Sequence, residues 1–135
     1  MPIPFVPQRG HILICDFRFG QIAPELGKER RVVVVSPRSY NRRHGMNAGR
    51  CIVVPFSATP PRVMTPAYVE FSVGRYRSLS ELTWAVCESI RSVSHDRLNR
   101  VWAAGANLNE SLAADDMARI EIGLRHALGI AIEVK

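Results

Sequence analysis

The stretch Arg31-Val-Val-Val-Val-Ser-Pro37, inside residues 28–45 (KERRVVVVSPRSYNRRHG), places four consecutive valines between groups of cationic side chains. β-Branched residues favour extended backbone, and a continuous apolar run predicts a strand that is buried on both faces. Proline lacks the backbone N–H that a sheet needs, so we expect this strand over residues 31–36. Such a strand would hold its flanking arginines at defined places on the rim of the core.

Further strands are predicted around this one. Alternating or β-branched segments lie at 11–17, 50–57, 68–72 and 82–88, the last continuing over 90–93 past a bend. Segments rich in glycine, proline or polar residues separate the first strands, at 18–29, 37–49 and 58–66. The second of these loops has room for one helical turn.

The hydrophobic period changes near the C-terminus, where an amphipathic helix is predicted over residues 112–128. Asn109 or Ser111 is its expected N-cap, and Gly129 its expected end. We therefore expect a single domain over residues 1–135 with a mainly β (α+β) fold. It would be a small barrel of five to seven strands, with the helix packed on the barrel or taking part in a dimer contact. The apolar residues at helical spacing are Met117, Ile120, Leu124, Ala127 and Leu128.

The charge of the chain is positive and concentrated in one segment. The 135 residues include 18 Lys and Arg against 12 Asp and Glu, for a formal net charge of +6. Such an arginine-rich patch attracts polyanions, because the planar guanidinium matches phosphate geometry. A solvated loop that keeps the protein soluble is the alternative interpretation. The cations of the segment 28–50 are Lys28, Arg30, Arg31, Arg38, Arg42, Arg43 and Arg50, against Glu29 alone.

The cysteines give no sign of a metal site. Cys15, Cys51 and Cys87 are widely spaced, and no cysteine–histidine spacing fits structural zinc. Each lies in an apolar, strand-like context, which suits reduced thiols. Because the sequence shows neither a signal-peptide pattern nor a membrane-spanning run, we expect a cytoplasmic protein without membrane contact.

The informative polar residues lie at strand ends. Arg30 precedes the valine strand, Ser57 ends the next strand, Glu25 lies in the preceding loop and Glu88 ends the strand at 82–88. If the strands at 31–36 and 50–57 pair antiparallel, Arg30 and Ser57 meet at one rim. A guanidinium beside a hydroxyl is a phosphate-binding pair. Taken singly, Arg30 could equally be a solvated strand flank and Ser57 a strand-end cap.

Four segments together resemble the MazF/PemK toxins of bacterial toxin–antitoxin systems: RGHILICDF (9–17), PELGKERRVVVVSPRSYNRR (24–43), CIVVPFSA (51–58) and AVCESIRSVSHDRL (85–98). The resemblance covers nearly the whole chain, with extra length around residues 60–80 and 100–110. It implies an SH3-like barrel with a C-terminal helix, related to that of the gyrase poison CcdB. It also implies an endoribonuclease that uses no metal or other cofactor.

The partners that the resemblance implies are an RNA substrate, an antitoxin and a second copy of the chain. The toxin would cut single-stranded RNA, including mRNA, at a short specific sequence and so inhibit translation. A cognate antitoxin with an acidic, disordered tail would neutralise it. The chain would form a homodimer, and it would contact operator DNA only as part of the toxin–antitoxin complex.

The resemblance also implies roles for single residues. Arg30 matches an arginine implicated in catalysis, and Ser57 matches the Thr or Ser that works with it. Glu25 matches an acid of the loop that shapes the RNA entry, and Glu88 falls at an acidic catalytic position of the PemK branch. The residues expected to bind RNA are Lys28, Arg31, Arg38, Asn41, Arg42 and Arg43, of which Asn41 and Arg42 match a recurrent N-R pair.

Three positions depart from the family pattern. His11 replaces an acid, Arg31 replaces a proline and Val86 replaces a catalytic arginine. These changes leave Arg30 as the main cationic catalyst and leave the general acid unassigned. A degenerate toxin without activity therefore stays among the alternatives.

In the expected reaction the RNA supplies its own nucleophile, the 2′-hydroxyl. Arg30 and Ser57 would hold the non-bridging oxygens of the phosphate, and Glu88 or Glu25 would remove the 2′ proton. The loops at 18–29, 37–49 and 58–66 would read unstacked bases. Two other classes remain open: a barrel that binds nucleic acid or peptide without catalysis, and a CcdB-like gyrase poison that acts through its C-terminal residues.

Overall fold

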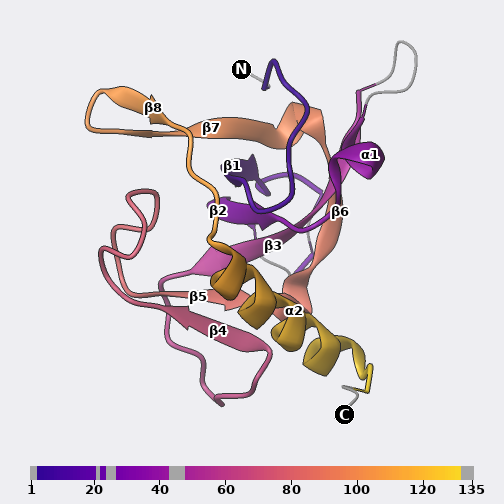
Figure 1. The fold of residues 1–135 in the computed structure, drawn as a ribbon, viewed down its shortest axis with the longest axis vertical. Coiled ribbons are helices and arrows are strands. Elements are labelled where there is room, and N and C mark those ends of the chain that lie inside the picture. Colours follow the sequence, from indigo (N-terminus) through magenta and orange to yellow (C-terminus); the bar gives the residue numbers. More distant parts are fainter. Residues whose placement is uncertain (1–2, 21, 24–26, 43–47, 132–135) are drawn as a thin grey trace.

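The computed structural model describes residues 3–20, 22–23, 27–42 and 48–131. Within these ranges the chain forms a curled antiparallel sheet with one long helix near the C-terminus (Figure 1). The strands are β1 (Ile12–Asp16), β2 (Glu29–Val34), β3 (Arg50–Ser57), β4 (Tyr68–Phe71), β5 (Thr83–Val86), β6 (Arg91–Ser94), β7 (Leu98–Ala103) and β8 (Ala106–Leu108). The helices are α1 (Arg38–Asn41), α2 (Ala114–Leu128) and the 3₁₀ turns η1 (Cys87–Ser89) and η2 (His95–Arg97).

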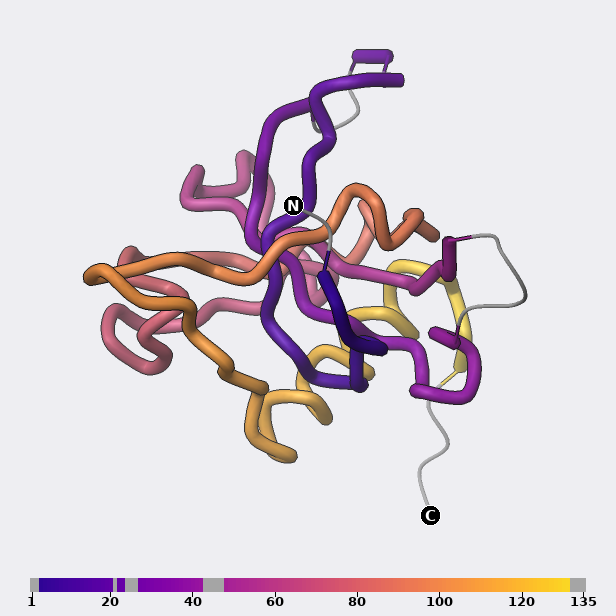
Figure 2. The backbone as a smooth tube through the Cα atoms, turned by 90° about the horizontal axis from the view of Figure 1, so that it is seen from above, coloured from indigo at the N-terminus to yellow at the C-terminus, as the bar shows by residue number. Residues whose placement is uncertain are grey.

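β3 is the central strand, because it pairs with three others. The strand order is β4-β5-β3-β2-β1-β7-β8, and β6 also pairs with β3. Val33 of β2 lies opposite Val54 of β3 on one side and Ile12 of β1 on the other. Among the described strands, β4 and β8 end the order, so the sheet curls without closing on itself. The β7–β8 hairpin projects from one side of the molecule (Figure 2).

The run of four valines is buried on both faces, as predicted, although β2 ends at Val34, two residues earlier than predicted, and Val35 follows it. Val33 and Val35 belong to the apolar cluster on one face of the sheet, whereas Val32 and Val34 belong to the cluster on the other face. The four side chains are almost completely inaccessible to solvent. Strand β2 begins at Glu29, two residues earlier than predicted, so the cations at positions 30 and 31 lie within the strand.

Helix α2 packs on the sheet, which confirms one of the two places predicted for it. Met117 and Ile120 belong to the first cluster. A Cβ atom on Gly123 would lie 2.7 Å from Sγ of Cys87, so the helix approaches η1 as closely as only glycine allows. Gly129 ends the helix in the left-handed conformation, with φ of 69°.

The start of α2 differs from the prediction. The helix begins at Ala114 with Ala113 as its N-cap, and neither Asn109 nor Ser111 caps it. Residues 110–112 instead lie alongside the start of β1. The backbone N–H of Ile12 donates to the carbonyl of Glu110, and that of Leu112 donates to the carbonyl of Gly10, both at 2.9 Å.

The strand count differs as well, although the mainly β class with a C-terminal helix is confirmed. The prediction of five to seven strands omitted β7 and β8, and the structure holds eight strands in the described residues. The hairpin turns at Ala104 and Gly105, which both have positive φ. Among the helices of the described residues, none combines the length and the apolar character that spanning a membrane requires.

Candidate functional site

Arg30 and Ser57 lie at the same end of the β2–β3 pair. The last paired residues at this end are Val32 and Pro55, and Arg30 and Ser57 each lie two residues beyond them. Beyond this pair the two strands have different partners, because Arg30 lies opposite Cys15 of β1 and Ser57 lies opposite Trp84 of β5. Side chains two positions apart share a face of the sheet, so both residues belong to the face of Val32 and Pro55.

A pocket of about 140 Å³ opens beside Arg30 at this rim. It combines three cations with two carboxylates and two hydroxyl groups over an apolar floor, which is the composition of a small polar-ligand site. Its walls come from the start of β2, the end of β3 and the segment that leads into β5. The lining residues are Lys28, Glu29, Arg30, Arg31, Phe56, Ala58, Leu79, Ser80, Glu81 and Thr83.

The two arginines of the pocket carry charge that is not neutralised within the described residues. The Nε atoms of Arg30 and Arg31 are buried without a hydrogen-bond partner there, and neither guanidinium forms an ion pair with a described carboxylate. Burial lowers the pKa of the Arg30 guanidinium from its ordinary value. An arginine stays protonated in proteins, so this rim offers two incompletely solvated cations to an anion.

The hydroxyl of Ser57 accepts one hydrogen bond from the backbone. Its Oγ accepts a hydrogen bond from the backbone N–H of Thr59 at 3.2 Å. A hydroxyl that already accepts in this way still has its hydrogen to donate. Its neighbour on β5 is Trp84, whose Nε1 is buried without a partner in the described chain.

Glu88 does not line this pocket. It lies in η1, where the chain turns away after β5, and its carboxylate accepts a 2.6 Å hydrogen bond from the hydroxyl of Tyr68. Trp84, which lies opposite Ser57, is four residues before it in the chain. Of the other predicted residues, Glu25 and Arg43 lie outside the described residues.

The remaining predicted residues follow the end of β2. Arg38 begins α1 and lines a different pocket. Asn41 is completely buried: its Oδ1 accepts a hydrogen bond from the hydroxyl of Ser36 at 2.5 Å, and its Nδ2 donates to the carbonyls of Pro7 and Ser36. The Asn41 amide therefore holds the end of α1 against Pro7 and Ser36. Arg42 follows α1 and is exposed.

Glu81 is the residue of this site that sequence reasoning missed. It lies in the pocket of Arg30 together with Ser80 and Thr83, and the Thr83 hydroxyl donates to the carbonyl of Glu81 at 2.7 Å. The segment reaches the rim because β5 pairs antiparallel with the end of β3. The polar stretch 77–81 (RSLSE) was a visible signal, but its place depends on a strand pairing that local sequence patterns do not reveal.

Comparison with known proteins gives one family match and one curated relative. Residues 8–128 match the family described as PemK-like, MazF-like toxin of type II toxin-antitoxin system. The chain is 30% identical to the protein YifN of Escherichia coli (strain K12) over 142 aligned residues, which cover 90% of this chain and 91% of the relative.

Solved structures of similar fold include two bacterial proteins at lower identity. MazF from Deinococcus radiodurans has a TM-score of 0.67 at 24% identity, covering 93% of this chain and 98% of its own. An endoribonuclease from a mycobacterial species, solved in complex with its cognate antitoxin, has a TM-score of 0.64 at 22% identity, covering 94% and 99%. At these identities the likeness establishes the fold.

Proposed function

The chain belongs to the family of PemK-like, MazF-like toxins of type II toxin–antitoxin systems, and on this premise we propose that it is an endoribonuclease that cuts single-stranded RNA at a short specific sequence. The observation that carries the proposal is the shared rim of β2 and β3. There, Arg30 and Ser57 each lie two residues beyond the last pair, Val32 and Pro55. Arg30 and Arg31 line a pocket that does not include Ser57, and neither arginine forms an ion pair with a described carboxylate.

The reaction that this rim supports needs no external nucleophile. The 2′-hydroxyl oxygen of the RNA attacks the adjacent phosphorus, and the bond from phosphorus to the 5′ oxygen breaks. The products are a 2′,3′-cyclic phosphate and a 5′-hydroxyl end. DNA lacks the attacking group, so it can occupy the site but cannot react. We propose that this reaction proceeds without a metal ion.

Arg30 and Ser57 have the properties that the pentacoordinate phosphate requires. Negative charge grows on the non-bridging oxygens, and Arg30 supplies a partly desolvated cation while Ser57 supplies a directed hydroxyl donor. Donors fixed in advance at such positions are each worth about 3 kcal/mol of transition-state stabilisation, or roughly a hundredfold in rate. Both groups are held by strand ends rather than by loops, which supports their preorganisation.

We propose Glu81 as the general base that removes the 2′ proton. It shares the pocket of Arg30, whereas Glu88 is engaged by Tyr68 outside it. Glu25, which precedes β2 in the sequence and lies outside the described residues, is a second candidate for this role. Lys28 and Arg31, which line the same pocket, would contact the flanking phosphates, with Arg42 and Arg43 following the RNA backbone farther along.

The antitoxin and the homodimer are also proposals for this chain. The mycobacterial endoribonuclease of similar fold was solved with its cognate antitoxin. An acidic, disordered antitoxin tail would find in the Arg30 pocket the same unpaired charge that RNA would use. Operator DNA would be bound by the resulting complex and not by this chain alone.

The test is incubation of the purified protein with single-stranded RNA in EDTA, followed by mapping of the product ends. Defined cuts that leave 5′-hydroxyl ends are the expected result. Binding without cuts would support a non-catalytic module, and inhibition of gyrase supercoiling with intact RNA would support a gyrase poison. Either of these results would reject the proposed reaction.

A further inference from the structure

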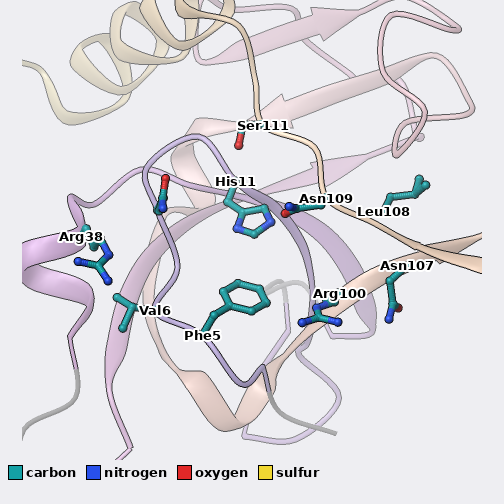
Figure 3. A pocket seen from close by; sticks show the side chains of 10 residues that line it. Phe5, Val6, His11, Arg38, Arg100, Asn107, Leu108, Asn109 and Ser111 are labelled. Atoms are coloured by element: carbon teal, nitrogen blue, oxygen red, sulfur yellow. The ribbon is translucent and has the colours of Figure 1, made fainter.

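A second and larger pocket lies at the other end of β1 from Arg30. Its volume is about 580 Å³, within the range of small-ligand sites (Figure 3). Arg30 lies opposite Cys15, and His11, which lines the second pocket, precedes Cys15 by four residues. Four residues of extended strand span about 13 Å, so the two pockets are separate places on the molecule.

His11 is the central side chain of this pocket. It is only 6% exposed, and its Nε2 is buried without a hydrogen-bond partner among the described residues. The ring of Phe5 stacks on it, with centroids 5.2 Å apart and planes at 26°. A buried ring nitrogen without a protein partner is unfavourable unless a water molecule or a ligand supplies the missing hydrogen bond.

The surroundings of the His11 imidazole favour its neutral form. Burial has the largest effect and lowers the pKa of His11. The hydrogen bond with Asn109 raises this pKa, and the nearby cation Arg100 lowers it, so that the net shift is downward. Arg38 is the other charged side chain of the pocket. A neutral imidazole can accept or donate at Nε2, depending on its tautomer, and therefore suits the edge of an uncharged heterocycle.

Two arginines of this pocket flank His11. Figure 3 shows Arg38 and Arg100 on opposite sides of the pocket, with His11 and Asn109 near each other between them. Neither arginine forms an ion pair with a carboxylate in the described ranges. The guanidinium of Arg100 lies 5.3 Å from the centroid of the Phe5 ring, which orients it along one wall.

We propose that this pocket binds one nucleotide of the single-stranded RNA substrate, away from the bond that is cut. The base would meet His11 and the amide of Asn109, and its two flanking phosphates would meet Arg38 and Arg100. An acidic peptide would use the two cations but would leave the unpartnered imidazole nitrogen and the amide unsatisfied, so the observations favour RNA. The inference rests on the proposed function for the identity of its ligand.

Binding of 2′-O-methyl trinucleotides tests the inference independently of cleavage, because they lack the attacking hydroxyl. The readout is the NMR signal of the His11 ring C–H at Cε1, assigned by its loss in His11→Gln. We expect the trinucleotides to shift this signal in the wild type and equally in Arg30→Ala, whose cut site is disabled. Arg100→Gln should weaken the binding at least fivefold, while Arg125→Gln, an exposed arginine at the end of α2, should change it less than twofold.

Several outcomes would overturn the inference. These are a His11 signal that no trinucleotide shifts, an equal shift with inorganic phosphate at the same concentration, or an equal shift with a hexaglutamate peptide. Failure of the proposed function would look different: the protein would leave RNA uncut in EDTA while the trinucleotides still shifted the His11 signal. Because Arg100 is exposed, the Arg100→Gln variant should fold, and circular dichroism would check it.

Discussion

The hydroxyl of Tyr68 donates a 2.6 Å hydrogen bond to the carboxylate of Glu88, and this contact lies outside the pocket of Arg30. Tyr68 lies opposite Val86, at the end of β5 that leads into η1. The start of β5 is the end that lies near the rim, since Trp84 is opposite Ser57. Two of the glutamates considered for proton removal, Glu81 and Glu88, thus lie beyond opposite ends of this short strand.

Replacing these glutamates one at a time should separate their roles. Glu81→Gln is expected to lower kcat for RNA cleavage by about a hundredfold or more, since a positioned base contributes 10²–10⁴-fold. Glu88→Gln serves as the matched control and should change kcat by less than about threefold, because it removes no group from the pocket. Single-turnover cleavage of a labelled oligonucleotide measures both. Equal losses in the two variants would remove Glu81 from its proposed role.

Arg30→Ala should lower kcat by roughly a hundredfold while the fold survives. Arg30→Lys should restore little of the loss, because an ammonium cannot reproduce the planar fork of the guanidinium. Arg125→Ala, in an exposed position of α2, controls for the loss of one positive charge. An Arg30→Ala rate within a factor of two of the wild type would contradict the mechanism.

Ser57 allows a test of the hydroxyl alone. Ser57→Thr keeps the donor and suits a strand, so it should retain activity to within a few fold. Ser57→Ala removes the donor and should lower kcat by about ten- to a hundredfold. The comparison of kcat for the two variants, with circular dichroism to check the fold, is the measurement. Similar rates in both would show that the hydroxyl takes no part.

Asp116 should make the stability of the protein depend on acidity. Burial alone would raise the pKa of its carboxyl, but hydrogen bonds from Tyr76, Arg75 and Arg119 outweigh burial and hold the pKa below the ordinary value of 3.8. A lowered pKa stabilises the folded state above the unfolded-state pKa, and this stabilisation is lost as the pH falls through the folded-state value. The Asp116 contribution should therefore be complete at pH 7 and decline below about pH 4.

Chemical denaturation of the wild type and of Asp116→Asn at several pH values measures the contribution of the Asp116 carboxylate to stability. The variant should lose about 1–3 kcal/mol in free energy of unfolding at pH 7, because its amide cannot replace the charged acceptor. The difference between the two proteins should shrink as the pH falls toward 3. A difference that stays constant with pH would mean that the carboxylate charge does not act through Tyr76 and the arginines.

The sequence predicted the core of the fold because its strongest pattern is local. The four valines dictate a buried strand without reference to anything distant, and Ser57 was placed at the end of β3, where the structure has it. The β7–β8 hairpin was missed because its turn uses Ala104 in a positive-φ conformation, for which alanine gives no signal. The helix start was misplaced because residues 110–112 are held by a backbone pairing with residues 10–12.

The site was harder to predict than the fold, for a related reason. Arg30 was identifiable because it lies next to the run of valines, which predicts a strand from local sequence alone. Glu81 reaches the same pocket only through the pairing of β5 with β3, which the polar stretch 77–81 does not reveal. Asn41 was predicted to bind RNA, and a polar residue in a basic loop is usually exposed to solvent. In the structure its amide is buried and donates hydrogen bonds to backbone carbonyls. Polar contacts between distant segments are not encoded in local periodicity.

The guanidinium groups of Arg30 and Arg31, which are partly buried and form no ion pair with a described carboxylate, also couple the stability of the chain to the binding of anions at the rim. Any polyanion that neutralises them binds the native chain better than the unfolded chain, so thermodynamic linkage raises the melting temperature in proportion to the logarithm of its concentration. The free protein is thereby its least heat-resistant form. A proposed antitoxin that covered the rim would at the same time protect the chain from unfolding and slow its degradation.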